Sequence, residues 1–172
     1  MPADFGIDRV VTARLVGRRP ELANAEAWAR WYTDPAIDEA AWPEHLRTAE
    51  DALPNVRETI RHWERWGFGR WTVLESGAPV GYAGLAHASV EGRPEVDLAW
   101  YFDSAVWNRG YATEMAREAV RVAFEVLELD DVVAYTTPGN GASLAVMAKL
   151  GMTYERDIVH AGLSHVLYRL GR

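Results

Sequence analysis

The clearest pattern of apolar and polar residues lies between Ala112 and Glu128. Apolar residues recur there at three- and four-residue spacing: Ala112, Met115, Ala116, Ala119, Val120, Ala123, Phe124 and Leu127. Charged residues take the other side: Glu114, Arg117, Glu118, Arg121, Glu125 and Glu128. One apolar stripe and one polar face predict a long amphipathic helix.

A mostly apolar stretch precedes this helix. Residues Glu95–Phe102 (EVDLAWYF) predict a strand with Asp97, Ala99 and Tyr101 on one face. Gly110 stands where the following loop becomes helix, and its lack of a Cβ lets a ligand approach the backbone. Strand, loop, glycine turn and helix in this order present free backbone N–H groups to a phosphate. A tight turn that needs glycine for conformational reasons explains Gly110 equally well.

The remaining pattern predicts a mixed fold. Before residue 95 we expect strands at Val10–Val16, Arg70–Leu74 and Pro79–His87, and helices at Leu22–Tyr32 and Pro54–Trp66. After the long helix we expect a strand at Asp131–Thr136, a helix at Gly141–Leu150 with Asn140 as N-cap, and a hairpin of Met152–Ile158 and His165–Leu170. Three strands joined by short turns predict an antiparallel meander, and strand–helix–strand predicts a right-handed βαβ unit. The expected fold is therefore α+β, a single domain over residues 1–172 with a mixed, mostly antiparallel sheet.

Composition narrows the function classes. The 172 residues suffice for one domain with a core, and 49% apolar and 25% charged residues are typical of a globular protein. A net charge of −7 disfavours nucleic acids and acidic membranes as partners and is compatible with an amine substrate. The absence of cysteine excludes disulfides, a thiolate nucleophile and a cysteine-type zinc site.

Other classes are disfavoured by what the sequence lacks. The first residues show no signal-peptide pattern, and no apolar run is long enough to span a bilayer, so we expect a cytoplasmic protein. The five histidines have no metal-ligand spacing, so no metal is expected. A nucleotide-binding α/β domain is disfavoured because the chain contains neither G-x-G-x-x-G nor a P-loop sequence.

Four motifs carry a family resemblance through their order and spacing. They are Trp107–Glu114 (WNRGYATE), Ala123-Phe124, Asn140–Ser143 (NGAS) and Lys149–Met152 (KLGM). Together they resemble the GCN5-related N-acetyltransferases (GNAT), and within that family they look most like the RimJ/RimL-like branch that acetylates ribosomal-protein N-termini and related small amines. Thr12-x-Arg14-Leu15 and Thr33-Asp34-Pro35 resemble the opening of that branch, so the likeness covers nearly the whole chain. The resemblance implies helices on both faces of the sheet, two splayed parallel strands, and direct acetyl transfer from acetyl-CoA to a primary amine.

The resemblance also implies where acetyl-CoA binds. The family has Arg or Gln, two residues, Gly, one residue, then Gly or Ala; here the first position is Trp107, so Asn108 and Arg109 are expected to replace it in part. The pyrophosphate is expected on the amides of the helix start, namely Arg109, Gly110, Tyr111, Ala112 and Thr113. The pantetheine is expected between the two splayed strands, along Leu98, Trp100, Tyr101 and Phe102.

Two residues of the next helix are candidates by the same resemblance. Asn140 matches the family residue that contacts the CoA arm, although a plain N-cap explains it equally well. Ser143 matches a serine that often lies near the thioester sulfur, and a first-turn serine is the alternative. The tyrosine that many family members use to protonate the thiolate is replaced by Met147. Either Ser143 or a water must then supply the proton.

The sequence also contains candidate residues for the acceptor amine. An ammonium with a pKa near 10 needs a base, and Asp97 is the candidate by resemblance, with Glu95 as runner-up. An ion pair with a neighbouring residue is the alternative for Asp97. Trp42, Trp63 and Trp66 are candidates for the acceptor pocket, because aromatic walls suit a cationic amine; core packing is the favoured alternative for tryptophans at helical spacing.

Two questions stay open at this point. A non-catalytic CoA-binding sensor with the same fold is the competing function, because the usual tyrosine is absent and Trp107 occupies the basic position. The sequence names neither the acceptor amine nor the oligomeric state, and a homodimer remains open.

Overall fold

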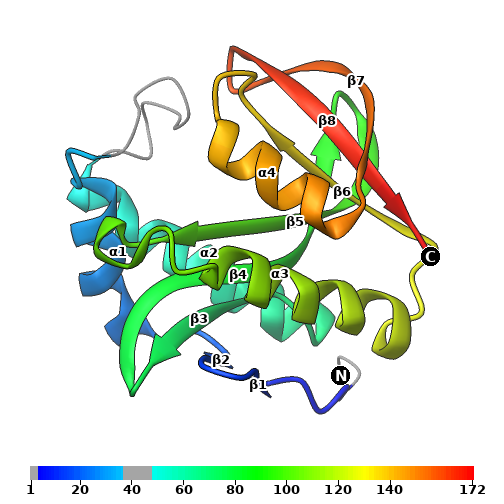
Figure 1. The fold of residues 1–172 in the computed structure, drawn as a ribbon. Helices are drawn as coiled ribbons and strands as arrows, with labels where there is room; N and C mark the ends of the chain where they lie inside the picture. The colour runs from blue at the N-terminus through cyan, green and yellow to red at the C-terminus, as the bar shows by residue number, and fades with distance from the viewer. Residues whose placement is uncertain (1–3, 37–47) are drawn as a thin grey trace.

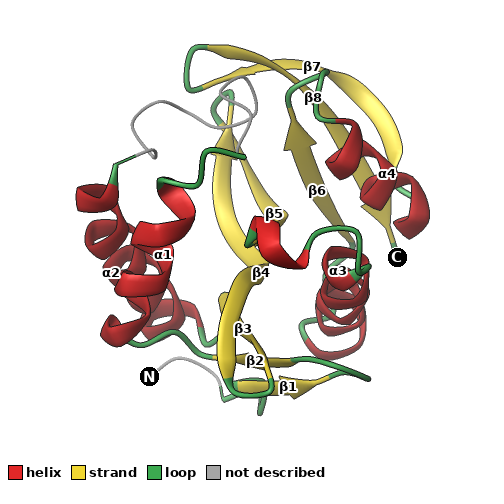
Figure 2. Ribbon diagram, turned by 60° about the vertical axis from the view of Figure 1, so that its left-hand side comes forward, coloured by secondary structure: helices red, strands yellow, loops and turns green. Residues whose placement is uncertain are grey.

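The computed structural model describes residues 4–36 and 48–172, and its strands form one mixed sheet. The strand order is β1-β2-β3-β4-β5-β6-β8-β7. Helices α1 (Ala25–Tyr32) and α2 (Ala49–Trp66) lie on one face, and α3 (Tyr111–Arg121) and α4 (Gly141–Leu150) lie on the other (Figures 1 and 2). The predicted α+β fold with helices on both faces is confirmed.

From β3 onward the strands follow the predicted order, and all of them except β6 are longer than predicted. The strands of the sheet are β1 (Arg9–Val11), β2 (Val16–Arg18), β3 (Arg70–Glu75), β4 (Ala78–Val90), β5 (Arg93–Phe102), β6 (Asp131–Thr136), β7 (Thr153–His160) and β8 (Leu163–Gly171). The meander β3–β4–β5 is antiparallel throughout. Its first turn uses Ser76 and Gly77 at φ 50° and 85°, the positive angles that a two-residue hairpin turn requires. At Gly81 a Cβ would lie 2.3 Å from the Tyr101 carbonyl oxygen, so only glycine lets the two strands pack this closely.

The prediction of one strand over Val10–Val16 is wrong. The chain reverses there, and the Thr12 amide donates to the Leu15 carbonyl at 2.9 Å between β1 and β2. The reversal is stabilised from outside the segment. The Glu114 carboxylate of α3 accepts from the Thr12 hydroxyl at 2.6 Å and from the Arg14 amide at 2.9 Å. Because this contact joins residues about a hundred positions apart, the local apolar pattern could not reveal it.

The helix starts and ends differ in two places. Helix α2 begins at Ala49 rather than Pro54, so Pro54 lies inside it. Thr48 is the N-cap, yet its hydroxyl bonds to the Asp51 carboxylate rather than to a backbone amide. The long predicted helix is confirmed, but beyond α3 it continues as a π-helical turn, Val122–Val126.

A half-buried histidine connects α2 to the meander. Nδ1 of His62 lies 2.8 Å from the Phe68 carbonyl oxygen, and Nε2 accepts from the His87 amide at 3.0 Å. A ring nitrogen that accepts an N–H carries no proton, so this arrangement holds His62 neutral. Burial, the largest influence, also lowers the pKa of His62 below its ordinary value.

The predicted βαβ unit is confirmed, and its strands diverge. Parallel strands β5 and β6 share one registered pair, Asp97 with Val133. Beyond it, residues 98–102 of β5 pair only with β4, so in the described structure their backbone groups on the β6 side have no strand partner. The sheet therefore opens next to the start of α3, where the two strands part (Figure 2).

Candidate active site

The start of α3 presents unused backbone donors. Gly110 is its N-cap at φ 79°, a left-handed angle that glycine adopts without strain. Regular bonding begins with the Glu114 amide, which donates to the Gly110 carbonyl at 3.0 Å. Among the described residues, no group accepts a hydrogen bond from the amides of Arg109–Thr113, and no side chain caps the helix. Free N–H groups and the positive end of the helix dipole make this an anion site.

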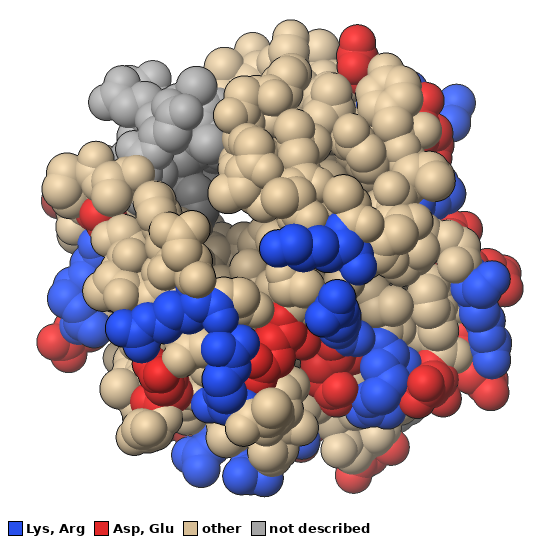
Figure 3. Space-filling model, in the orientation of Figure 1, with Lys and Arg blue, Asp and Glu red and all other residues tan. Residues whose placement is uncertain are grey.

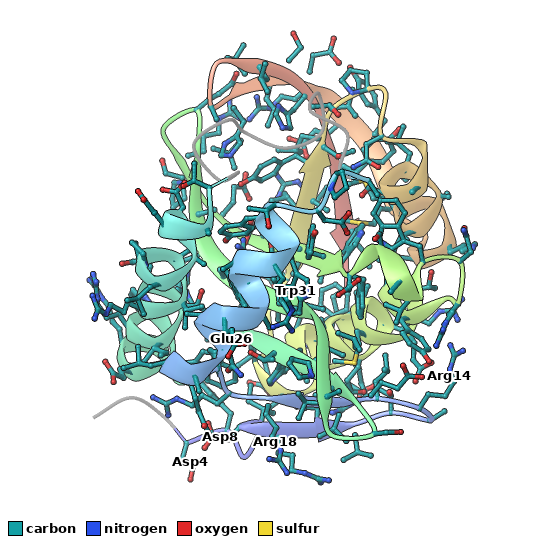
Figure 4. The ribbon with its side chains drawn as sticks, turned by 90° about the vertical axis from the view of Figure 1, so that its left-hand side faces the viewer. Asp4, Asp8, Arg14, Arg18, Glu26 and Trp31 are labelled. Atoms are coloured by element: carbon teal, nitrogen blue, oxygen red, sulfur yellow. The ribbon has the colours of Figure 1, made fainter. Side chains whose placement is uncertain are left out.

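Hydrogen bonds hold the Arg14 side chain beside the start of α3. Its Nε donates to Oε2 of Glu114 at 2.7 Å, its Nη1 donates to the Arg109 carbonyl at 2.8 Å, and its guanidinium lies 4.7 Å from the centre of the Tyr111 ring. Figure 4 shows Arg14 in the turn between β1 and β2, next to α3. Partial burial would raise the pKa of Glu114, but hydrogen bonds from Thr12 and Arg14 outweigh it and hold that pKa below its ordinary value.

A cavity of about 500 Å³ opens at this point. It is lined by Ala13, Arg14, Gly110, Thr113, Glu114, Arg117 and Lys149. Figure 3 looks onto this side of the molecule and shows basic side chains along α3 and beneath α4, with acidic ones between them. Of the lining residues, only Gly110 and Thr113 were predicted. Arg14 stands in the Thr12-x-Arg14-Leu15 motif and Lys149 opens the KLGM motif, but neither motif assigns them to a ligand, and nothing in the sequence indicated Arg117.

The predicted replacements for the missing basic residue lie on the same loop. Asn108 is exposed and adopts φ 60°. Arg109 is half exposed, and its Nη1 lies 3.6 Å from the Glu75 carboxylate. The Tyr111 hydroxyl also donates to Glu75. Arg109 is thus partly neutralised, whereas Arg14 reaches the helix start from another part of the sheet. Trp107 turns its indole N–H to the Phe102 carbonyl at 2.7 Å.

The strand that should carry the pantetheine contributes mainly its backbone. Leu98 and Phe102 are buried in the core beside α3, and Trp100 packs partly against it. Tyr101 points to the opposite face, where its hydroxyl donates to the Trp31 carbonyl at 2.9 Å beneath α1. A ligand between β5 and β6 would therefore meet exposed backbone amides and carbonyls, an edge-strand mode of binding.

Asn140 and Ser143 lie together where β6 leads into α4. The Asn140 side-chain oxygen accepts from the Ser143 amide at 3.1 Å, and its amide nitrogen donates to the Thr136 hydroxyl at 3.0 Å. Asn140 is therefore an N-cap, and its contact with the CoA arm stays a prediction. Ser143 is half buried, and no described residue bonds to its hydroxyl. Met147 is 1% exposed in the core, so this helix offers no acid at that position.

Asp97 forms a buried ion pair. Both of its oxygens accept from Nη2 of Arg70, at 2.9 and 2.7 Å, and the Tyr135 hydroxyl lies 3.4 Å from Oδ2. Burial would lower the pKa of Arg70, but the Asp97 carboxylate outweighs it and raises that pKa. Asp97 can take a proton only by weakening this pair, and its catalytic role stays a prediction. The runner-up, Glu95, is paired with Arg169 at 2.8 Å.

Two of the three tryptophans of the predicted acceptor pocket are described, and they differ in burial. Trp63 is fully buried and donates to the Arg70 carbonyl at 2.9 Å, so the alternative of core packing is correct and the pocket role is wrong. Trp66 is 40% exposed and lies beside His87, with ring centres 4.4 Å apart. Trp42 lies outside the described residues.

Residues 4–36 and 48–172 contain neither a cluster of metal-ligating side chains nor a helix that could cross a bilayer. No group of three or more histidines and carboxylates there is arranged to hold a metal ion. None of the described helices combines the length and apolarity that crossing a bilayer requires.

Comparisons with known proteins agree with this geometry. The family model of the acetyltransferase (GNAT) domain matches residues 14–153. The chain is 33% identical over 142 residues to FsC-acetyl coenzyme A-N(2)-transacetylase of Aspergillus fumigatus, which covers 78% of this chain and 54% of that relative. The chain thus spans about half the length of that relative. It is also 33% identical over 146 residues to the uncharacterized N-acetyltransferase YnaD of Bacillus subtilis, which covers 85% of this chain and 83% of the relative.

Solved structures share the fold. An acetyltransferase from Agrobacterium tumefaciens superposes with a TM-score of 0.78 at 23% identity, covering 95% of this chain and 94% of its own. RimJ of Mycobacterium smegmatis in complex with CoA-disulfide superposes with a TM-score of 0.72 at 20% identity, covering 91% and 81%. The match of the family model to most of the chain, together with the free helix start beside two diverging strands, shows that this chain belongs to the GNAT acetyltransferase family.

Proposed function

We propose that this protein transfers the acetyl group of acetyl-CoA directly to a primary amine, either a protein N-terminus or a small amine. The observation that carries the proposal is the set of unused amides at Arg109–Thr113, which lies where β5 and β6 diverge. A diphosphate on those amides would leave the rest of the CoA arm to follow the open edge of β5. The family membership supports the acetyl donor.

Acetyl transfer requires three events. The amine nitrogen bonds to the thioester carbonyl carbon, the carbon–sulfur bond breaks, and CoA leaves as a thiolate that must be protonated. Unpaired backbone amides near Leu98–Trp100 are our candidates for stabilising the carbonyl oxygen as it gains negative charge. Ser143, half buried with an unengaged hydroxyl, or a water supplies the proton to sulfur.

Asp97 remains our candidate for taking the proton from the acceptor ammonium. It is buried at the closed end of the diverging strands, one residue before the open stretch of β5. Arg70 holds its carboxylate in place, and Tyr135 lies within 3.4 Å to relay or orient a proton. Proton transfer to Asp97 would break part of its ion pair with Arg70.

Three observations bear on the class of acceptor. The relative from Aspergillus fumigatus is named for transfer to an N(2) nitrogen, and the structural relative RimJ belongs to the branch that the sequence resembles. The net charge of −7 is compatible with a cationic acceptor. These observations favour an amine, on a peptide or on a small molecule, over other nucleophiles.

A non-catalytic CoA sensor is the second candidate. Two observations favour it: Met147 is buried where the usual acid stands, and Asp97 is engaged by Arg70. Calorimetry with acetyl-CoA, followed by release of free thiol in a panel of peptides and small amines, separates the candidates. Binding with turnover supports the transferase, binding without turnover against any amine supports the sensor, and the absence of binding rejects both.

A further inference from the structure

Lys149 is the only lysine in the chain, and it lies on the cavity at the start of α3. It comes from the last turn of α4, whereas Arg117 comes from α3 and Arg14 from the β1–β2 turn. A lysine near a helix C-terminus is favourable on its own account, so its presence in α4 needs no ligand. What needs explanation is that three separate elements direct cations to one cavity.

The cavity is electropositive although the chain is acidic. Its lining holds Arg14, Arg117 and Lys149 against the single carboxylate of Glu114, a local balance of +2 in a chain of −7. Arg14 is already paired with Glu114. Neither Arg117 nor Lys149 has an ion pair or hydrogen bond with any described side chain, while Arg121, one turn further along α3, is paired with Glu118 and Glu125. Two uncompensated cations therefore border the cavity.

One phosphate group does not account for both parts of this site. The free amides occupy the start of α3, and Arg117 lies six residues further along, about 9 Å down the helix axis at 1.5 Å per residue. A diphosphate seated on the amides therefore leaves room for a second anion near Arg117 and Lys149. Acetyl-CoA carries such a second anion, because its ribose bears a 3′-phosphate in addition to the pyrophosphate.

We infer that Arg117 and Lys149 bind the 3′-phosphate of acetyl-CoA, so that this protein discriminates against the 3′-dephospho form. The inference rests on the proposed function and names the recognising residues. Arg14 is the positioning residue, because its hydrogen bonds to Glu114 and to the Arg109 carbonyl fix the start of α3 relative to the β1–β2 turn. Cation–phosphate hydrogen bonds are stronger than neutral ones, which makes the loss of one phosphate measurable.

Calorimetric titration with CoA and with 3′-dephospho-CoA tests the inference. The unmodified protein should bind CoA about tenfold or more tightly, since charged hydrogen bonds carry the difference. Arg117→Gln and Lys149→Gln should each weaken CoA binding, and the double variant should bring the two affinities within about twofold while leaving 3′-dephospho-CoA binding unchanged. Arg121→Gln is the matched control, since its side chain is not part of the cavity lining, and it should retain the full preference.

The single lysine allows a second readout that does not depend on activity. Labelling with an amine-reactive reagent and peptide mapping should show Lys149 protected by CoA and much less protected by 3′-dephospho-CoA. Equal affinities or equal protection for the two ligands would overturn the inference and leave the proposed function standing. A preference that survives in the double variant would also overturn it. Failure to bind either ligand would instead reject the proposed function.

Discussion

Replacing Asp97 by Asn should separate its part in acetyl transfer from its part in the fold. The change leaves Arg70 facing a neutral amide, with 28% of the Arg70 side chain and 6% of the Asp97 side chain exposed. Removing one partner of a buried ion pair costs about 3–5 kcal/mol. Arg70 keeps some access to water, and the new amide oxygen still accepts one hydrogen bond, so we expect a loss of about 2–3 kcal/mol. For a chain of this length that lowers Tm by about 4–12 °C.

A double-mutant cycle isolates the pair. Arg70→Met leaves the Asp97 carboxylate buried without its counter-ion and should be at least as destabilising as Asp97→Asn. The double variant buries no charge at either position, so its loss of unfolding free energy should be about 2 kcal/mol smaller than the sum of the single losses. Urea unfolding followed by tryptophan fluorescence measures all four proteins. Additive losses within about 0.5 kcal/mol would refute the coupling.

The same variants decide the catalytic question. If Asp97 accepts the proton, Asp97→Asn and the double variant should both lose about 10²–10⁴-fold in kcat and lose the alkaline rise of the rate, with CoA affinity near normal. Thiol release across the pH range measures this, below the Tm of every variant. Activity that returns in the double variant as stability returns would remove Asp97 from proton transfer and leave it as the anchor of Arg70.

Three other changes test the phosphate seat, the tryptophans and the histidine link. Gly110→Val should abolish CoA binding in calorimetry, because a branched side chain at φ 79° is strained and enters the cavity. Gly110→Asn is the control and should keep most of the CoA binding, because Asn tolerates that angle. Normal CoA binding by the valine variant would refute the proposed phosphate site. Trp63→Ala should lower the free energy of unfolding in urea by about 3–5 kcal/mol, and Trp66→Ala should lower it by less than about 1 kcal/mol. If Trp66 lines the acceptor pocket, Trp66→Ala should also raise KM for the amine. Equal stability losses in the two variants would contradict the burial of Trp63. Folding lowers the pKa of His62, so the unfolded chain takes up the proton first as pH falls. The contribution of His62 to the free energy of unfolding is therefore complete above about pH 6.5 and is lost at lower pH. His62→Gln should flatten the part of the stability–pH curve between pH 5 and 7 that this residue causes, and an unchanged slope would exclude it as the source.

Local periodicity determined the elements that frame the site. The apolar stripe from Ala112 to Leu127 predicted the long helix because burial on one face repeats with the helical turn. Asn140 and Gly151 marked the ends of α4 correctly, since N-caps and left-handed C-caps depend on nearby backbone groups. The order of strand, glycine turn and helix also led to the free amides at Arg109–Thr113 before any packing was known.

Tertiary structure decided which polar side chains meet. Val10–Val16 has the pattern of one strand, but a carboxylate on α3 folds it into a hairpin and places Arg14 at the helix start. Asp97 looked equally suited to act as a base or as an ion-pair partner until Arg70, from a strand not adjacent to β5, was placed beside it. Arg117 carries no sequence signal and Lys149 is marked only as part of the KLGM motif, because each is an ordinary exposed residue of its own helix.

The same distinction applies to the tryptophans. Trp63 and Trp66 are three residues apart on one helix, yet one is fully buried and the other is 40% exposed. The physical reason is the range of the forces involved. Backbone hydrogen bonding and caps act within a few residues and leave a readable pattern, whereas cavities, ion pairs and the exposure of a given face depend on which distant segments the packing of the sheet brings together.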